Sequence, residues 1–292
     1  MPIWQEYILA QSIEGALQAL EQAPQPSCVI AGGTDLLLDL QQGRHAPVHT
    51  LVDITNIPEM NDLAIRQDRL YIGAAVALDN ILATPLVKRH AEALFEAVSL
   101  IGGPQVRNTA TLGGNVSHGL PAGDGTIALL ALQAMAEIAG KEGRRMLPVN
   151  DLFLGPGKSI LQLYNELLVG FYLPLKSIHQ GSAFRRIMRP QGVAIAILNM
   201  AAWVHLDEEV ITGVRISVGP AAPIPFRASA TEKYLLGKQI NNETLSSAGE
   251  TLLAEARLRT SPHRASAEYR RLMAVELLSE VLCCAGQRAG ES

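Results

Sequence analysis

A pair of adjacent glycines lies between two apolar segments near the start of the sequence, in Ala31-Gly32-Gly33-Thr34-Asp35. Two residues without β-carbons let the backbone adopt positive φ angles and approach another group closely. Backbone amides exposed at the start of the helix predicted to follow favour an anion, and a phosphate is the usual one. The alternative interpretation is a tight strand-to-helix turn in which Thr34 or Asp35 caps the helix.

A second glycine pair occurs in Thr111-Leu112-Gly113-Gly114-Asn115, which we also interpret as a turn. Hydroxyl and amide side chains surround it, including Thr109 and Ser117, and Asp124 follows. Two amide-rich loops that converge can bind the two linked phosphates of a pyrophosphate. Asp124 is suited to accept hydrogen bonds from sugar or ribityl hydroxyls, and its alternative role is to cap the helix predicted to begin there.

Other phosphate-binding motifs fit this sequence poorly. The dinucleotide fingerprint G-x-G-x-x-G requires spaced glycines after a strand, and neither glycine pair has that spacing. The segment GPGKS at residues 155–159 resembles the end of a P-loop, but Leu152 stands where that motif requires its first glycine. The sequence therefore argues against a nucleoside triphosphatase.

Hydrophobic periodicity predicts the helices and strands that would position these segments. Helices are predicted over residues 12–22, 34–43, 78–83, 91–103, 124–134, 228–237, 242–258 and 261–286. Strands are predicted over residues 27–31, 49–54, 63–67, 70–76, 166–174, 193–206 and 211–222, with two more around a turn at residues 140–143. The last helix is predicted to begin with Ser261 as its N-cap and Pro262 in its first position.

Composition restricts the class of protein. The chain has 292 residues, of which 48% are hydrophobic, so it can bury one large or two moderate cores. A net charge of -4 and the lack of Lys or Arg runs argue against nucleic-acid binding. The longest apolar run, residues 193–204, is too short to span a bilayer, and the first residues do not resemble a signal peptide. Three dispersed cysteines predict neither disulfides nor a metal site and suit a reducing, cytoplasmic location.

The two glycine motifs, in this order, resemble those of a known family. The segments AGGTDLL and GGPQVRNTATLGGN are similar to segments in the FAD-binding subunit of molybdenum hydroxylases, the family of xanthine dehydrogenase and carbon monoxide dehydrogenase. The segments DLFLGPGKS, ELLVGFYLP and GSAFRRIMR also match that family. The resemblance covers essentially the whole chain, and the two motifs are far more specific together than either is alone.

This resemblance implies an α+β fold. Residues 1–176 would form an FAD-binding domain of the vanillyl-alcohol-oxidase type, with two α/β subdomains at about residues 1–57 and 58–176. Residues 181–288 would form a C-terminal α+β domain like that of the carbon monoxide dehydrogenase flavoprotein, with a small antiparallel sheet covered by helices. The sequence changes near residues 175–181 to strands followed by helices, in agreement with that division.

The resemblance also implies a set of cofactor-binding residues. Family members hold the FAD pyrophosphate on two loops, which correspond here to Cys28, Val29, Ile30, Ala31, Gly32, Gly33, Thr34 and Asp35, and to Ala110, Thr111, Leu112, Gly113, Gly114 and Asn115. Ser117 and Asp124 match positions that contact polar parts of the cofactor, and Leu167 and Phe184 match positions near the flavin ring. Because the cofactor carries the redox chemistry, no side chain is assigned a catalytic role.

The function that the resemblance implies is electron transfer within a complex. FAD would accept electrons from two-iron iron–sulfur clusters of a small partner subunit, while a large partner with a molybdenum cofactor hydroxylates the substrate. The terminal acceptor would be NAD+, oxygen or a quinone. This chain is expected to bind no metal, since its cysteines cannot supply four cluster ligands from one loop. Two alternatives remain open: a self-contained flavin-dependent oxidase or dehydrogenase of a small molecule, and a non-catalytic nucleotide-binding scaffold module.

Overall fold

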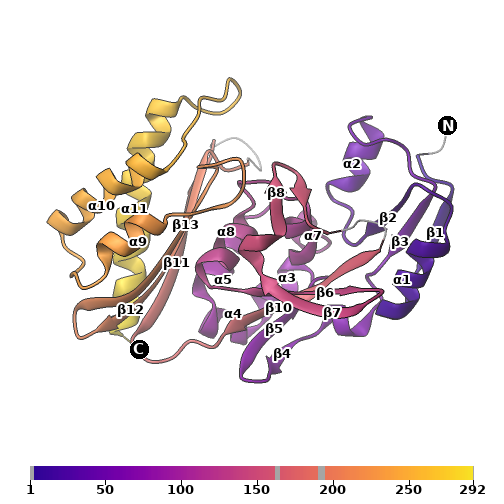
Figure 1. Cartoon of the computed structure of the whole chain (residues 1–292), viewed down its shortest axis with the longest axis horizontal. Helices are drawn as coiled ribbons and strands as arrows, with labels where there is room; N and C mark the ends of the chain where they lie inside the picture. Colours follow the sequence, from indigo (N-terminus) through magenta and orange to yellow (C-terminus); the bar gives the residue numbers. More distant parts are fainter. Residues whose placement is uncertain (1–2, 162–164, 190–194, 292) are drawn as a thin grey trace.

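The structure is a computed structural model that describes residues 3–161, 165–189 and 195–291. Sheets of three, five and four strands follow one another along the described chain, and a two-stranded ribbon accompanies them. We call the first three the N-terminal, central and C-terminal sheets. Figure 1 shows them side by side along the long axis, from the indigo N-terminal sheet to the orange and yellow C-terminal region. The predicted α+β fold class is confirmed.

The N-terminal sheet is parallel, with the strand order β1-β3-β2. Its elements are β1 (Glu6–Leu9), α1 (Ile13–Gln22), β2 (Ser27–Ile30), α2 (Leu36–Gln41) and β3 (Thr50–Asp53). The Ser12 hydroxyl accepts a hydrogen bond from the Gly15 amide at 3.0 Å, so Ser12 is the N-cap of α1. Because β2 ends at Ile30, the first glycine pair lies at the carboxyl edge of this sheet, where α/β folds commonly bind ligands.

The central sheet is antiparallel, with the order β4-β5-β10-β6-β7. Its strands are β4 (Leu63–Arg66), β5 (Arg69–Gly73), β6 (Met135–Gly140), β7 (Gly143–Pro148) and β10 (Glu166–Pro174). The chain between β5 and β6 forms α3 (Leu78–Ala83), α4 (Pro85–His90), α5 (Glu92–Ser99), α6 (Pro104–Arg107), α7 (Leu112–Ser117) and α8 (Asp124–Ala131). Short elements complete this part: η1 (Pro58–Asn61), η2 (Val149–Leu152), β8 (Phe153–Gly155) and β9 (Lys158–Ser159).

The C-terminal sheet is antiparallel and lies between two layers of helices. Its strands are β11 (Gln180–Ile187), β12 (Leu198–Asp207), β13 (Val210–Gly219) and β14 (Phe226–Arg227), followed by α9 (Ser229–Leu235), α10 (Asn242–Glu255) and α11 (Ala267–Gly290). Helix α11 packs along β11 and β12, whereas α5 and α8 pack against the sheet from the central part of the chain. Side chains that alternate along β12 accordingly join different cores: Met200 belongs to the C-terminal core and Ala201 to the central one.

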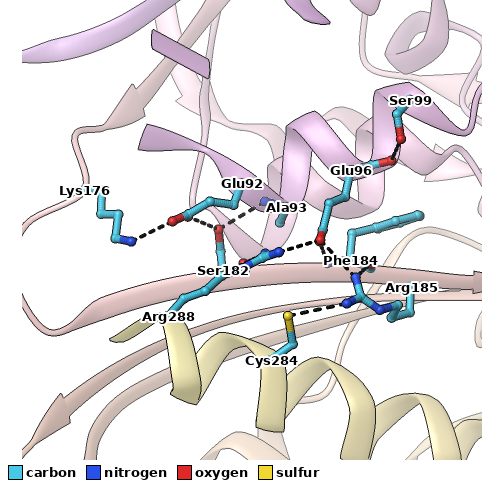
Figure 2. A network of polar contacts seen from close by, with 10 residues as sticks. All are labelled: Glu92, Ala93, Glu96, Ser99, Lys176, Ser182, Phe184, Arg185, Cys284 and Arg288. Atoms are coloured by element: carbon cyan, nitrogen blue, oxygen red, sulfur yellow. Dashed lines mark hydrogen bonds and ion pairs between the residues drawn. The ribbon is translucent and has the colours of Figure 1, made fainter. Parts of the chain in front are cut away.

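Polar contacts, drawn in Figure 2, join α5 to β11 and α11. Glu96 accepts hydrogen bonds from the Phe184 amide at 2.8 Å and from Arg288 Nη2 at 2.6 Å. Glu92 accepts one from Ser182 Oγ at 2.9 Å. Burial raises the pKa of Glu96, but the hydrogen bonds from Arg288 and Phe184 outweigh burial and lower that pKa. The stabilisation from Glu96 is therefore present at neutral pH and is lost as the pH falls through the lowered pKa.

Many of the predicted elements are confirmed, with shifts at their ends. Strand β10 has the predicted bounds, and β6 and β7 form the predicted hairpin around residues 140–143. The strand predicted over residues 193–206 begins only at Leu198; residues 193 and 194 lie outside the described residues. The described helices include none with the length and apolar character needed to cross a bilayer.

The predicted start of the last helix is wrong. Helix α11 begins at Ala267, and its N-cap is Ser266, whose hydroxyl accepts a hydrogen bond from the Tyr269 amide at 3.1 Å. Ser261 instead closes a turn, because its amide donates to the Ala265 carbonyl at 2.9 Å. Two serines that could each serve as an N-cap precede this helix. Because Ser261 takes part in a turn, Ser266 is the residue that caps the helix.

Other local expectations are also wrong. The second glycine pair lies within α7 rather than in a turn, because Thr111 caps a helix that includes both glycines. Strand β1 and helix α4 were not predicted, since each is short and lacks a clear apolar period. Strand β11 is also absent from the predicted strands, although its Phe184 is buried.

Contact between β11 and α11 at Gly181 provides a test of the C-terminal packing. A β-carbon at Gly181 would lie 2.1 Å from the Ala285 carbonyl oxygen, so Gly181→Ala must push the helix away from the sheet. We expect the free energy of unfolding, measured by urea denaturation, to fall by about 1–3 kcal/mol, the usual cost of overpacking a core. Gly290→Ala is the control, because nothing lies within 4 Å of its β-carbon. Equal stability of the two variants would contradict this packing.

Candidate functional site

The first glycine segment presents a run of unpaired backbone amides. Within the described residues, no hydrogen bond is formed by the amides of Gly32, Gly33, Thr34, Asp35 and Leu36. Gly33 has φ +65°, a left-handed conformation that favours glycine. Successive unpaired amides around a left-handed residue form a concave anion-binding surface, so the segment fits a phosphate.

The two glycine segments are in direct contact. A β-carbon built on Gly32 would lie 2.0 Å from the Thr109 carbonyl oxygen and 2.9 Å from Ala110 Cα. Any side chain at position 32 would therefore separate the first segment from the second. This contact brings together the two segments that the sequence analysis proposed to converge.

The second segment uses its amides internally, contrary to the expectation of two amide-rich loops. The Gly113 amide donates to the Ala74 carbonyl at 2.9 Å, and the Gly114 amide donates to Thr111 Oγ1 at 3.0 Å. A β-carbon on Gly113 would lie 2.5 Å from the Ala74 carbonyl oxygen, so this glycine lets α7 pack on the end of β5. Gly114 and Ser117 are exposed on α7.

Asn115 connects α7 to α8. Its side-chain Oδ1 accepts a hydrogen bond from the Thr126 amide at 3.3 Å. That amide is in the first turn of α8, where helical amides lack partners within the helix. Asn115 therefore fixes the start of α8 beside the second glycine segment.

His118 and Asp35 form a further link between the two segments. His118 Nδ1 lies 3.3 Å from Asp35 Oδ2. The hydrogen bond with Asp35 raises the pKa of His118, against the opposing effect of burial, and the same bond lowers the pKa of Asp35. Asp35 occupies the N-cap position of α2, but its side chain makes no capping hydrogen bond there. The alternative capping role for Asp35 is therefore wrong.

Asp124 is buried at the start of α8, with 7% of its side chain exposed. Its Oδ2 accepts a hydrogen bond from Arg186 Nη1 at 2.5 Å, and its Oδ1 accepts one from Asn199 Nδ2 at 2.5 Å. Burial raises the pKa of Asp124, and the Arg186 charge and the Asn199 hydrogen bond act against that rise. No side-chain cap is formed at α8, so the alternative capping role is wrong here as well.

The remaining predicted residues lie around these segments. Cys28, Val29 and Ile30 belong to β2, with Ala31 directly after it. Burial raises the pKa of the Cys28 thiol, which suits a packed side chain. Leu167 on β10 and Phe184 on β11 are both buried in the core of the central sheet. Whether any of these residues contacts the flavin stays a prediction.

Sequence reasoning missed Arg186 and Asn199. Both lie on strands of the C-terminal sheet, on the side that faces α8. The available signal was the charge of Arg186 within GSAFRRI and the amide of Asn199 in the largely apolar β12, since buried charged and amide groups require partners. The periodicity of a strand does not reveal that the hydrogen-bond acceptor of both residues is Asp124, because Asp124 lies far away in the sequence.

Comparison with known proteins identifies the class of this fold and site. Residues 4–176 match the family described as FAD binding domain in molybdopterin dehydrogenase, and residues 182–285 match the family described as CO dehydrogenase flavoprotein C-terminal domain. The chain is thus an oxidoreductase flavoprotein, and its cofactor is FAD.

Relatives of known class match nearly the full length. The chain is 33% identical to the xanthine dehydrogenase FAD-binding subunit of Escherichia coli O157:H7, over 96% of this chain and 97% of that one. It is 29% identical to the carbon monoxide dehydrogenase medium chain of Hydrogenophaga pseudoflava, over 97% of each. A solved structure of that organism's carbon monoxide dehydrogenase aligns over 99% of both chains, with a TM-score of 0.92 and 28% identity. The chain belongs to the FAD-binding subunits of the molybdenum hydroxylase family.

The link between His118 and Asp35 predicts a pH effect. Because the folded-state pKa of His118 lies above its usual value, the link stabilises the fold below that usual value and is lost as the pH rises through the raised pKa. Asp35→Asn removes the carboxylate, so we expect a lower His118 pKa in an NMR titration of the FAD-free chain. Asp207→Asn, on the distant β12, is the control. An unchanged His118 pKa in Asp35→Asn would show that the two side chains do not pair.

Proposed function

We propose that this chain is the electron-carrying FAD subunit of a molybdenum hydroxylase complex, and that the first glycine segment holds the FAD pyrophosphate. The observation that carries this proposal is the run of amides from Gly32 to Leu36 that form no hydrogen bond with the described part of the chain. Amides spread the interaction with a diphosphate over several neutral donors, so no cationic side chain is required. The contact between Gly32 and Thr109 limits the approach of the ligand to one side of the segment.

Other residues complete the proposed FAD site. Ser117 is exposed like Gly114, whereas the Asn115 side chain is directed at the start of α8. Both side chains would bind polar parts of the cofactor. Asp124 would accept a hydrogen bond from a sugar or ribityl hydroxyl through lone pairs that Arg186 and Asn199 leave unused. Leu167 and Phe184 would form the apolar environment of the flavin ring. We assign residues 1–176 and 181–288 to the two domains of the family.

When bound, FAD supplies the redox chemistry, and the protein orients it and excludes water. Names of relatives, such as medium chain and FAD-binding subunit, support an assembly with other subunits. We infer a small partner with two-iron iron–sulfur clusters as the electron donor and a large partner with the molybdenum cofactor. Electrons leave this subunit for NAD+, oxygen or a quinone, and we place the complex in the cytoplasm.

Gly114→Val tests the proposed site without disturbing the core. Gly114 is exposed and its β-carbon would meet only Thr111 Oγ1, at 3.1 Å, so we expect the variant to fold. The added side chain would stand where the cofactor approaches, and we expect FAD affinity to fall by roughly tenfold or more, equivalent to losing about 1.4 kcal/mol of binding. The measurement is flavin absorbance per chain after purification, followed by titration with FAD.

Gly103→Val is the matched control, since it changes a glycine pair outside the proposed site. Its β-carbon would lie 3.4 Å from the flexible Gln105 side chain. Stoichiometric flavin in both variants would contradict the site. Steady-state oxidation of a small alcohol or amine by the isolated chain would instead favour a self-contained flavoenzyme, and a bound flavin that is not bleached on reduction would favour a scaffold module.

A further inference from the structure

Asp124, Arg186 and Asn199 form a buried polar cluster between α8 and the C-terminal sheet. Arg186 comes from β11 and Asn199 from β12, and each donates to a different oxygen of the Asp124 carboxylate. Only 6% of the Arg186 side chain and 7% of the Asp124 side chain are exposed. The ion pair is therefore held almost completely away from water.

The same cluster fixes the turn that precedes α8. Asn199 Nδ2 also donates to the Ala122 carbonyl at 3.1 Å. A β-carbon on Gly219 would lie 2.3 Å from the Pro121 carbonyl oxygen, so this glycine lets the turn approach β13 closely. Since Asn115 binds the Thr126 amide on the same helix, α8 connects the second glycine segment to the C-terminal sheet.

Burying this cluster has a free-energy cost that a purely structural contact would not justify. Among the described residues, Arg186 Nε, Asn199 Oδ1 and Thr126 Oγ1 are buried without a hydrogen-bond partner. Each such atom opposes folding by its lost hydration, and a buried ion pair often stabilises a fold no more than apolar side chains of similar volume would. A carboxylate held this way is instead typical of a functional site.

We propose that Arg186 and Asn199 are positioning residues for FAD: they hold Asp124 as an ionised, oriented acceptor for a hydroxyl of the cofactor's sugar-alcohol chain. The C-terminal sheet then completes an FAD site whose phosphate segment lies on the N-terminal sheet. This inference rests on the proposed function, because it assigns two further residues to the same site.

Arg186 is the charged group that acts on Asp124 in the described chain. Several charged groups on the elements packed around α8 have other partners. Glu92 and Glu96 on α5 bind Ser182 and Arg288, and His118 beside α7 binds Asp35. Arg215 on β13 binds the Ala131 carbonyl, and Arg227 on β14 binds Glu232. Asp151 on η2 and Asp207 on β12 are exposed. Burial is already the largest influence on the pKa of Asp124 and raises it, so loss of the Arg186 charge would raise that pKa further.

The test measures the Kd of FAD for the full chain, stripped of flavin, from mildly acidic to alkaline pH. For Arg186→Gln we expect FAD binding to weaken by roughly tenfold or more at neutral pH, the effect of losing a charge-assisted hydrogen bond. Binding should recover as the pH rises, because deprotonation restores the carboxylate. Arg186→Lys keeps the charge and should give a smaller loss that does not vary with pH.

Arg185→Gln is the matched control. Arg185 is the neighbouring residue on β11, and its side chain contacts Glu96 and Cys284 instead of Asp124. Its Kd should stay within about twofold of the wild-type value, well under the effect of one hydrogen bond. In an Asp124→Asn background, Arg186→Gln should weaken binding no further, because Arg186 acts through that carboxylate.

Three results would overturn the inference: an unchanged Kd for Arg186→Gln, a loss that does not vary with pH, or an equal loss in the Asp124→Asn background. If Arg186→Gln does not fold, Asn199→Ala carries the same comparison, against its Asp124→Asn double variant. A wild-type chain that binds no FAD contradicts the proposed function itself. Normal wild-type binding with no effect of Arg186 contradicts only the role of Arg186.

Discussion

The close approach of Gly32 to the Thr109 carbonyl is the constraint on which the candidate site depends. The first segment follows β2 of the N-terminal sheet and the second lies at the start of α7, and their backbones meet at a distance that leaves no room for a β-carbon. This contact places the unpaired amides that follow Gly32 next to the exposed surface of α7. A ligand that spans both segments therefore meets neutral backbone donors on one side and polar side chains on the other.

The rest of the fold holds these two segments in place. Gly113 lets α7 pack on the end of β5, and Asn115 ties α7 to α8. Helix α8 in turn lies against the C-terminal sheet, to which it is joined by the Asp124 cluster. The contacts of Glu96 with Phe184 and Arg288 join the same sheet to α5. Polar contacts thus run from the proposed phosphate segment through α7, α8 and the C-terminal sheet to α5 and the last helix.

Sequence patterns predicted the long elements and the identity of the glycine segments, because apolar periodicity and paired glycines are local signals. They failed where two local signals compete or where a tertiary contact decides. Ser261 and Ser266 have the same cap chemistry, and the turn at Ser261 determines which one begins α11. The sequence predicts that Gly113 offers its backbone amide to a ligand. In the structure that amide donates to the Ala74 carbonyl, and the close contact with Ala74 is the reason why a glycine is needed there. Arg186 went unassigned because its partner lies on an element distant in sequence.

Helix α8 has one further consequence for how the chain behaves as a whole. All of its residues are buried, and it contacts the C-terminal sheet as well as elements of the central part. Residues 177–179, which connect β10 to β11, are exposed by contrast. A protease that cuts this connector would leave two fragments that stay associated, since separation would expose the apolar sides of α8 and β12 to water. We therefore expect the two halves to unfold as one cooperative unit, although an exposed segment links them.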